Sequence, residues 1–534
     1  MIQELAGMAE LVDAQDLKSC AEQSACRFDP GSRQESLSGN REAFFMEKKM
    51  TPHVYPRQCA FKSIEDIKGK KVTIMGLGLN GGGEAAVRFF LNKGAYVTVT
   101  DMKTEEQLKA TVDKLNSDTS LDHSRLTYRL GEHRIEDFEN ADCVIKNPGV
   151  KFEGNKYLAA AKAIETDLSI FLRFTDCPII AVTGSKGKSS TVSAIYYGLK
   201  EAGFDAYLGG NITVSPLTFF DQVSGDTPVV IEFSSWQLAD LRGRGVLRPH
   251  IAIITKIVPD HQNWYGNMED YVADKRLIYA DQTKGDYSLF DSGEDQPGTG
   301  PDQTLHPGCP TWGDLFASET KATVLRYGVK PSWQIELGDL LVPGVHMKTN
   351  AQNAATVMHL MGIPDDRIKE ILQKWPGIDH RLQYFHSWKN ENGTNIKFYN
   401  DSCATVPEAA AAATQAFGKP VILMTGGTEK GLELTPLIKT LTAPDAETIK
   451  VKDIYLLAGT ATDKLVPELD KAGIKYHGPF NGLEPLLQEA KEFLKNEKAS
   501  EEVFVFSPGA TSFGMFSNEF DRGNKYMTAV KQLF

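Results

Sequence analysis

The segment that most constrains this chain is a glycine-rich turn between an apolar run and an apolar-periodic run. Residues 178–190 read as a buried strand, a turn and a helix start. In the turn, Gly184 and Gly187 let backbone N–H groups close around an anion, and the helix N-terminus adds its partial positive charge. Lys188 supplies a full charge, and Ser189 a hydroxyl suited to Mg²⁺. The segment therefore predicts a site for a nucleotide phosphate.

The spacing of this turn is unusual. The common phosphate loop has four residues between its glycines, whereas only two separate Gly184 from Gly187. A glycine-rich turn with a solvated lysine is the alternative, but strand, Gly-Lys-Ser and helix follow one another in the order that phosphate binding needs. We expect ATP to contact the whole turn, formed by Gly184, Ser185, Lys186, Gly187, Lys188, Ser189 and Ser190.

Length and composition indicate a soluble protein of several domains. The 534 residues exceed one hydrophobic core, because a domain averages roughly 150 residues. A net charge of −12 without a long basic run argues against nucleic acid as a partner. No apolar stretch approaches the ~18 residues that span a bilayer, and no secretory signal is apparent. Seven scattered cysteines fit reduced thiols, so we expect a cytoplasmic protein without membrane partners.

A second glycine-rich turn occurs earlier in the chain. Residues 71–83 read as a strand and a turn with Gly76, Gly78 and Gly81, and a helical run and a strand ending at Asp101 follow. In such a unit the first glycine permits the turn, the second lets a phosphate approach, and the third allows close helix–strand packing. With strand, helix and acidic residue all in place, the pattern predicts a site for a dinucleotide or another diphosphate nucleotide.

Alternating strands and helices predict an α/β protein with three domains in series. Residues 66–175 read as a Rossmann-like domain, residues 176–377 as a P-loop ATPase-type parallel sheet, and residues 378–534 as a second Rossmann-like domain. Near-continuous apolar runs such as 228–233 imply strands buried on both faces. Residues 1–45 are polar with little periodicity, and we expect residues 1–65 to form an N-terminal extension that is either disordered or an over-called start.

Three polar positions follow the phosphate loop in the central region. Glu232 ends a buried strand, where sheets of this class bind ligands, and Mg²⁺ prefers carboxylate oxygens. His261 follows the next strand, and Lys275 lies in a helical run. On the residues alone, Glu232 also fits a helix cap, His261 an ordinary loop histidine, and Lys275 a solvated helix lysine.

These motifs resemble those of the Mur ligases of peptidoglycan synthesis over nearly all of residues 66–534. The short glycine spacing is typical of that family, and similar elements occur at residues 209–212, 232–238 and 260–261. The likeness is greatest to the members that add D-glutamate to UDP-N-acetylmuramoyl-L-alanine. It implies an ATP-dependent carboxylate–amine ligase that forms an acyl phosphate, uses Mg²⁺ and acts as a monomer.

The resemblance also implies roles for individual residues. The catalytic residues would be Lys188, Glu232, His261 and Lys275. The metal ligands would be Ser189, Glu232, His261 and Lys275, the last carbamylated so that its amine becomes an oxygen ligand. Beyond the phosphate loop, ATP would contact Asn350, Asn353, Arg381 and Asp401. The UDP-linked substrate would contact Gly76, Leu79, Asn80, Gly81, Asp101, Met102, Asn147 and Asn211. The incoming amino acid would contact Lys430, Ser512 and Phe513.

Four positions depart from the family's pattern. Thr349 stands where a histidine often precedes the first asparagine, and Cys403 replaces a lysine, so any role of that lysine is lost or moved. Lys186 stands where asparagine is common. Lys103 replaces the arginine after Asp101, which weakens the uridine assignment because arginine and lysine differ in fork geometry.

Three other functions stay open at this point. A Mur-type ligase with a different amino-acid substrate shares all of these motifs. A nicotinamide-dependent dehydrogenase uses residues 76–101 for NAD but leaves the phosphate loop and Glu232 unexplained, and a non-catalytic nucleotide-binding regulator is the third. For a ligase, closure of three domains excludes water from the acyl phosphate, so we expect a hinge near residues 376–380.

Overall fold

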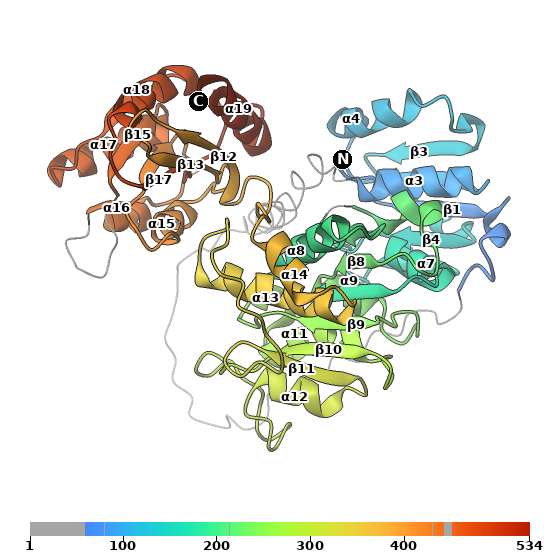
Figure 1. Ribbon diagram of the computed structural model, residues 1–534. Coiled ribbons are helices and arrows are strands. Elements are labelled where there is room, and N and C mark those ends of the chain that lie inside the picture. Colours follow the sequence, from blue (N-terminus) through green and yellow to red (C-terminus); the bar gives the residue numbers. More distant parts are fainter. Residues whose placement is uncertain (1–58, 80, 213, 430, 443–450) are drawn as a thin grey trace, which may run out of the picture.

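Three sheets, each formed by one continuous part of the chain, make up the computed structural model (Figure 1). The structure describes residues 59–79, 81–212, 214–429, 431–442 and 451–534. The predicted α/β class with three domains is confirmed, whereas the boundaries at 66, 176 and 378 stay predictions. The expectations for most of the N-terminal extension, for Asn80 and for Lys430 lie outside the described residues.

The first sheet has five parallel strands in the order β3-β2-β1-β4-β5. Its strands are β1 (Lys71–Met75), β2 (Tyr96–Asp101), β3 (Leu126–Leu130), β4 (Cys143–Lys146) and β5 (Ile164–Glu165). Its helices are η2 (Glu65–Ile67), α3 (Gly82–Asn92), α4 (Glu105–Asn116), η3 (His123–Arg125), α5 (Ile135–Glu139), α6 (Lys156–Ala160) and α7 (Asp167–Phe174).

The close packing between β1 and α3 depends on a different glycine from the one predicted. A Cβ atom on Gly83 would lie 2.2 Å from the carbonyl oxygen of Leu77, so only glycine fits there. Gly81 instead precedes α3 with a φ of 83°, a conformation that glycine adopts without strain. The glycine that allows close packing of the helix is therefore Gly83, two residues after the predicted Gly81.

The central sheet has six parallel strands in the order β11-β10-β9-β6-β8-β7. Its strands are β6 (Ile179–Thr183), β7 (Tyr207–Gly210), β8 (Val229–Glu232), β9 (Ile251–Ile254), β10 (Tyr287–Asp291) and β11 (Thr323–Tyr327). Its helices are α8 (Lys188–Glu201), η4 (Pro216–Gln222), α9 (Ser235–Asp240), α10 (Gln262–Tyr265), α11 (Met268–Lys275), η5 (Arg276–Tyr279), α12 (Trp312–Glu319), α13 (Val345–Leu360) and α14 (Asp365–Leu372).

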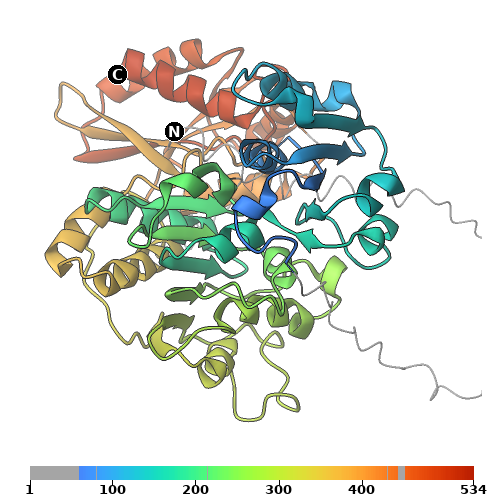
Figure 2. The same ribbon diagram turned by 90° about the vertical axis from the view of Figure 1, so that its right-hand side faces the viewer.

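The third sheet has the order β12-β13-β17-β14-β15-β16, with β12 antiparallel to β13 and the other pairs parallel. Its strands are β12 (Gln383–Lys389), β13 (Asn395–Asn400), β14 (Ile422–Gly426), β15 (Asp453–Leu457), β16 (His477–Phe480) and β17 (Glu501–Phe506). Its helices are α15 (Pro407–Gln415), α16 (Thr435–Thr442), α17 (Thr460–Lys471), α18 (Leu483–Lys495) and α19 (Glu519–Leu533). Figure 2 shows these helices from a second side.

Two buried ion pairs join the first sheet's region to the central region. Lys146 Nζ lies 2.8 Å from Asp240 Oδ2, and Arg244 Nη1 lies 2.8 Å from Glu165 Oε2, with all four side chains at most 5% exposed. Rings of the two regions also pack edge to face, as between Phe89 of α3 and the following region's Phe220. Separating the two regions would break both ion pairs and leave their buried charges uncompensated, which is costly. The ion pairs and the ring contacts therefore fix the two glycine-rich turns relative to each other.

Within the described ranges, no helix combines the length and the apolar composition that crossing a membrane requires.

Candidate active site

The phosphate loop follows β6 and leads directly into α8, as predicted. Its backbone is held by the end of β9, where the carbonyl oxygen of Lys256 accepts hydrogen bonds from the N–H groups of Ser185 (2.9 Å) and Lys186 (3.2 Å). Lys188 Nζ donates to the carbonyl oxygen of Ser185 at 3.2 Å, so this ammonium folds back over its own loop. The phosphate loop is therefore preformed, and Lys188 lies at the N-terminus of α8.

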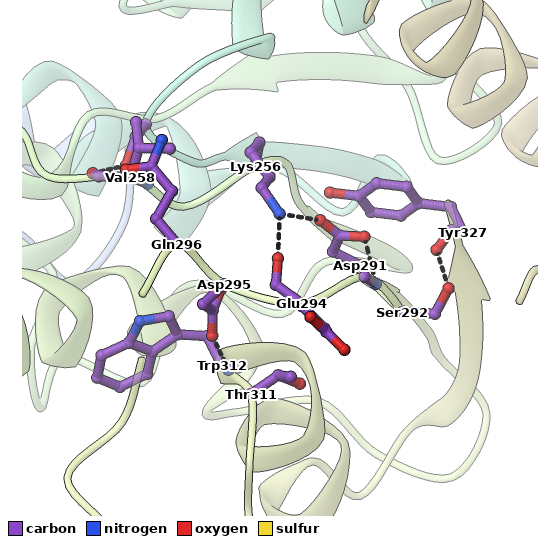
Figure 3. Close-up of polar contacts among 12 residues, drawn as sticks. Lys256, Val258, Asp291, Ser292, Glu294, Asp295, Gln296, Thr311, Trp312 and Tyr327 are labelled. Atoms are coloured by element: carbon purple, nitrogen blue, oxygen red, sulfur yellow. Dashed lines mark hydrogen bonds and ion pairs between the residues drawn. The ribbon is translucent and has the colours of Figure 1, made fainter. Parts of the chain in front are cut away.

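The strand that holds the loop is itself anchored by the segment after β10. Lys256 Nζ donates to Asp291 Oδ2 (3.1 Å) and to the carbonyl oxygen of Glu294 (3.0 Å), as Figure 3 shows. A few residues on, Asp295 accepts the N–H of Trp312 at 2.8 Å. These contacts tie the ends of β9 and β10 together beneath the phosphate loop.

The glycines of the loop are required by what surrounds them. Gly187 has a φ of 91°, and a Cβ atom there would lie 2.7 Å from Asn350 Oδ1 of α13. A Cβ atom on Gly184 would lie 2.0 Å from Thr255 Oγ1. Helix α13 is held against α8 because Gly198 meets Met358 closely, and a Cβ atom on Gly198 would lie only 2.4 Å from Met358 Sδ. The loop and Asn350 are thus packed as one unit.

We expect Gly187→Ala to weaken ATP binding more than it weakens the fold. Gly203 has a similar φ of 95° with no atom within 4 Å of its Cβ position, so Gly203→Ala is a matched control that costs only the backbone strain of about 1–2 kcal/mol. The clash with Asn350 adds to that strain at position 187, and we expect a rise of about tenfold or more in the KM for ATP. Steady-state kinetics and thermal unfolding of both variants measure the difference. Equal KM values in the two variants would contradict this reading.

Glu232 ends β8 inside the protein, where its side chain is 1% exposed. Asn211 Nδ2 donates to its Oε1 at 2.9 Å. Its other oxygen, Oε2, has no hydrogen-bond partner among the described residues. A buried carboxylate oxygen without a donor is costly, so this atom is suited to a cation such as Mg²⁺.

Lys275 is buried at the end of α11, with 2% exposure, which overturns the reading as a solvated helix lysine. Its Nζ donates to the carbonyl oxygen of Gly184 at 2.9 Å and lies 4.5 Å from the ring centroid of Tyr271. Burial and the nearby charge of Lys188 lower the pKa of Lys275 well below its usual value. The amine therefore loses its proton more readily than an exposed lysine does.

The sequence analysis did not identify Tyr271, although its side chain contacts both the phosphate loop and Lys275. It is 1% exposed, and its hydroxyl donates to Ser185 Oγ at 2.9 Å. Ser185 Oγ in turn donates to the carbonyl oxygen of Val258 at 2.8 Å. The only sequence signal is its spacing of four residues before Lys275, which places both side chains on one face of α11.

His261 precedes α10 with a φ of 50°, a left-handed conformation uncommon outside glycine. Its ring lies 5.1 Å from that of Trp236, which follows Glu232 in the chain. Beside it, Asp260 Oδ2 pairs with Lys186 Nζ at 3.4 Å. The lysine that replaces the family's common asparagine therefore faces the Asp-His pair.

One cavity of about 610 Å³ joins the phosphate loop to the glycine loop after β1. The predicted residues that line it are Gly76, Leu79, Asp101, Met102, Asn147, Ser185, Lys186, Gly187, Lys188, Ser189, Ser190, Asn211, Glu232, His261, Lys275 and Arg381. The described residues that were predicted but do not line it are Gly81, Gly184, Asn350, Asn353, Asp401, Ser512 and Phe513. Lining residues without a sequence signal include His133, Asp167 and Ser215.

Asp101 shapes the glycine loop of the first sheet. Its Oδ2 accepts the N–H groups of Leu77 (2.9 Å) and Gly78 (3.1 Å), and its Oδ1 accepts the N–H of Lys103 (2.9 Å). In NAD-binding domains the corresponding carboxylate bonds the ribose. Here both oxygens already accept backbone donors, which favours a structural role and weakens the dehydrogenase alternative.

Asn353 lies one turn after Asn350 on α13 and is 1% exposed. Neither polar atom of its side-chain amide has a hydrogen-bond partner among the described residues. Native proteins rarely leave a buried amide unsatisfied. A polar ligand beside α13 would supply the missing partners.

The two predicted amino-acid-binding residues that the structure describes, Ser512 and Phe513, do not line the cavity. Ser512 is buried and Phe513 is 61% exposed, both after β17 of the third sheet. Asp401 accepts the N–H of Leu382 (3.1 Å) and the hydroxyl of Ser507 (2.6 Å). Of the described residues after 377, only Ile378 and Arg381 line the cavity.

His380, within the predicted hinge, is expected to make the stability of the fold depend on pH. Its Nδ1 accepts from Asn400 Nδ2 at 2.8 Å, and burial lowers its pKa to about 4. The unfolded chain takes up a proton near pH 6.5, whereas the native chain does not until about pH 4. Stability is therefore lost as pH falls between these values, by at most about 1.4 kcal/mol per pH unit.

We expect His380→Gln to reduce this loss. Urea unfolding at pH 7.5 and pH 5 compares the variant with the wild type and with His346→Gln, which changes an exposed histidine. The drop in unfolding free energy between the two pH values becomes smaller only in His380→Gln. An unchanged drop in that variant would refute the assignment.

Domain and sequence comparisons agree with this geometry. Residues 182–297 match the Mur ligase middle domain, and residues 70–168 match the MurD-like N-terminal domain of Mur ligases. The UDP-N-acetylmuramoylalanine–D-glutamate ligase of Treponema pallidum (strain Nichols) is 39% identical over 548 aligned residues, covering 88% of this chain and 98% of the relative. The ligases of that name from Borreliella burgdorferi (strain ZS7) and Roseiflexus sp. (strain RS-1) are 36% and 32% identical, covering 88% and 87% of this chain and 99% of each relative. The resemblance predicted from the motifs is confirmed: this chain belongs to the Mur ligase family of ATP-dependent ligases.

Proposed function

We propose that this protein joins D-glutamate to UDP-N-acetylmuramoyl-L-alanine in peptidoglycan synthesis, with ATP as co-substrate. The relatives named above carry that activity in their names. The observation that carries the proposal is the shared cavity, in which the phosphate loop and the glycine loop after β1 face one space. A nucleotide-linked carboxylate bound at one loop thereby meets the γ-phosphate bound at the other.

The first step is attack of the substrate carboxylate on the γ-phosphorus of ATP. A new carboxylate–phosphorus bond forms, the bond to the bridging oxygen breaks, and ADP leaves with that electron pair. The Lys188 ammonium and the N–H groups at the N-terminus of α8 stabilise the β- and γ-phosphates, and Lys186 adds a second ammonium that lines the same cavity. Positioning and charge neutralisation account for most of the rate gain in phosphoryl transfer.

We propose that four side chains around the cavity hold a magnesium ion. Glu232 Oε2 is buried without a partner among the described residues, and the hydroxyl of Ser189, the ring of His261 and the side chain of Lys275 line the same cavity. Carbamylation of the neutral Lys275 amine by carbon dioxide, with loss of a proton, would turn this side chain into an anionic oxygen ligand. When bound, Mg²⁺ supplies positive charge to the phosphate oxygens.

In the second step, the amine of D-glutamate attacks the acyl carbon, phosphate leaves with the bonding electrons, and the amine loses a proton. Water must be absent, because it would hydrolyse the acyl phosphate. Ser512 and Phe513, together with Lys430, are proposed to hold the glutamate, and Asn350, Asn353, Arg381 and Asp401 to hold ATP. Asp401, Ser512 and Phe513 approach the cavity if the third domain closes at a hinge near residues 376–380, where Gly377 and His380 have φ values of 93° and 62°.

The test is an ADP-release assay with ATP, Mg²⁺ and UDP-N-acetylmuramoyl-L-alanine. D-Glutamate should support turnover, whereas L-alanine and L-lysine should not. Turnover with another amino acid instead would favour the Mur-type alternative with a different substrate. No ADP release with any amino acid would count against a ligase. Oxidation of NADH in a parallel assay that contains this cofactor would then favour the dehydrogenase.

We also propose that the ligase acts as a monomer in the cytoplasm. The cysteines in the described part of the chain are all free thiols, as a reducing compartment predicts. Light scattering during size-exclusion chromatography checks the monomer, for which a mass near 58.9 kDa is expected.

A further inference from the structure

The third domain buries a charged side chain that the proposed chemistry does not use. Arg522, in the first turn of α19, is 1% exposed. Arg522 is among the largest fully buried side chains, and the carboxylates of Glu519 and Asp401 act on it electrostatically. Burial lowers the pKa of its guanidinium to about 10, so the group remains charged at neutral pH. Burying a charge is costly unless hydrogen bonds and nearby charges compensate it, so the hydrogen-bond partners of this guanidinium indicate its role.

The guanidinium hydrogen-bonds to two loops at once. Its Nε donates to Ser402 Oγ (3.0 Å) and its Nη2 to the carbonyl oxygen of Ser402 (2.7 Å). Its Nη1 donates to the carbonyl oxygen of Ala510 at 2.9 Å. Ser402 lies next to Asp401, and Ala510 lies two residues before Ser512. One planar fork thus joins the loop after β13 to the loop after β17.

These loops meet at the ligand-binding edge of the third sheet. Strands β13, β17 and β14 are neighbours and parallel, so their carboxyl ends lie together, where open α/β sheets bind ligands. The two loops also contact each other, since the N–H of Gly509 donates to the carbonyl oxygen of Ala404 at 2.8 Å. The loop after β17 then bonds the loop after β14, because the N–H of Thr511 donates to the carbonyl oxygen of Thr428 at 2.9 Å.

We propose that Arg522 is a positioning residue that sets the loop bearing Asp401 and the loop bearing Ser512 and Phe513 in one register. This inference rests on the proposed function, in which the first loop serves ATP and the second serves D-glutamate. Two carbonyl acceptors and a hydroxyl on separate turns match a rigid fork, which a lysine ammonium does not reproduce. The positive charge also lies beneath an edge whose ligands are all anionic.

The test compares Arg522→Lys and Arg522→Met with Lys525→Met, which removes an exposed lysine from the same helix. In Arg522→Met we expect the KM values for D-glutamate and ATP to rise by about tenfold or more, with the KM for UDP-N-acetylmuramoyl-L-alanine within about twofold of the wild type. Arg522→Lys keeps the positive charge but loses the planar fork, so we expect it to raise the KM values for the same two substrates. If Arg522→Met does not fold, this variant alone decides the test. Wild-type KM values in a folded Arg522→Lys would overturn the proposal.

A readout without turnover separates this inference from the proposed function. Hydrogen–deuterium exchange of the full-length protein should speed up together in residues 401–405 and 509–513 of Arg522→Lys, and in neither segment of Lys525→Met. Faster exchange confined to α19 would show a local structural role and overturn the proposal. If the wild type releases no ADP with D-glutamate, the proposed function fails while the exchange result still decides the role of Arg522.

Discussion

Replacing Lys275 with alanine should lower the rate of ADP release by roughly a thousandfold, the scale of loss when a preorganised electrostatic group is removed. The side chain is buried between the phosphate loop and Tyr271, and its amine bonds the carbonyl oxygen of Gly184. Because burial and Lys188 lower the pKa of Lys275, the amine is neutral more readily than an exposed one. A neutral amine is the form that reacts with carbon dioxide, and the proposed carbamate is a ligand that alanine cannot supply.

Short carboxylic acids should partly restore the activity of Lys275→Ala. Acetate or formate fits the space left by the side chain and returns an oxygen pair to the cavity. Lys284→Ala, at an exposed position, serves as the control and should neither lose activity nor respond to acetate. Full activity in Lys275→Ala without added acid would exclude a role for this residue. Loss of activity without any rescue would leave a role for the amine itself and exclude the carbamate.

The parts of the site that the sequence predicted well are those with a local signature. The phosphate loop needs a strand, two glycines and a helix within thirteen residues, and the structure places all of them in that order. Glu232 was predicted because a buried apolar run ends in a carboxylate, and the run is indeed a central strand. In both cases the backbone that shapes the residue lies beside it in the chain.

The parts that could not be predicted depend on partners far away in sequence. The burial of Lys275 comes from a loop 91 positions earlier, so its helix alone reads as solvated. Arg522 bonds Ser402 across 120 positions, and Lys146 pairs with Asp240 across the junction of two domains. The antiparallel edge strand β12 was also missed, since its side chains are mostly half-buried. Contacts between residues so far apart in the chain produce no periodicity and no motif in the amino-acid sequence.

Replacing Glu232 with glutamine should raise the stability of the ligand-free protein and lower its activity. The carboxylate is 1% exposed, Asn211 supplies a donor to Oε1, and Oε2 has no partner in the described part of the chain. Glutamine keeps the acceptor for Asn211 and removes a buried negative charge whose Oε2 has no hydrogen-bond donor among the described residues. Without ligands, the free energy of unfolding should therefore rise, by about 1–2 kcal/mol.

The same substitution should lower activity by roughly a thousandfold or more, since a neutral amide is a poor ligand for Mg²⁺. Thermal unfolding with ATP, with and without Mg²⁺, measures the coupling directly. The wild type should gain stability from the ion, and Glu232→Gln should gain little. Glu201→Gln, at the exposed end of α8, is the control and should behave as the wild type in both measurements. A variant that is less stable without ligands and still responds to Mg²⁺ would mean that Glu232 supports the fold and that the metal binds elsewhere. A more stable but inactive variant is what a carboxylate kept for a cation predicts, because its buried charge is favourable only when that cation is present.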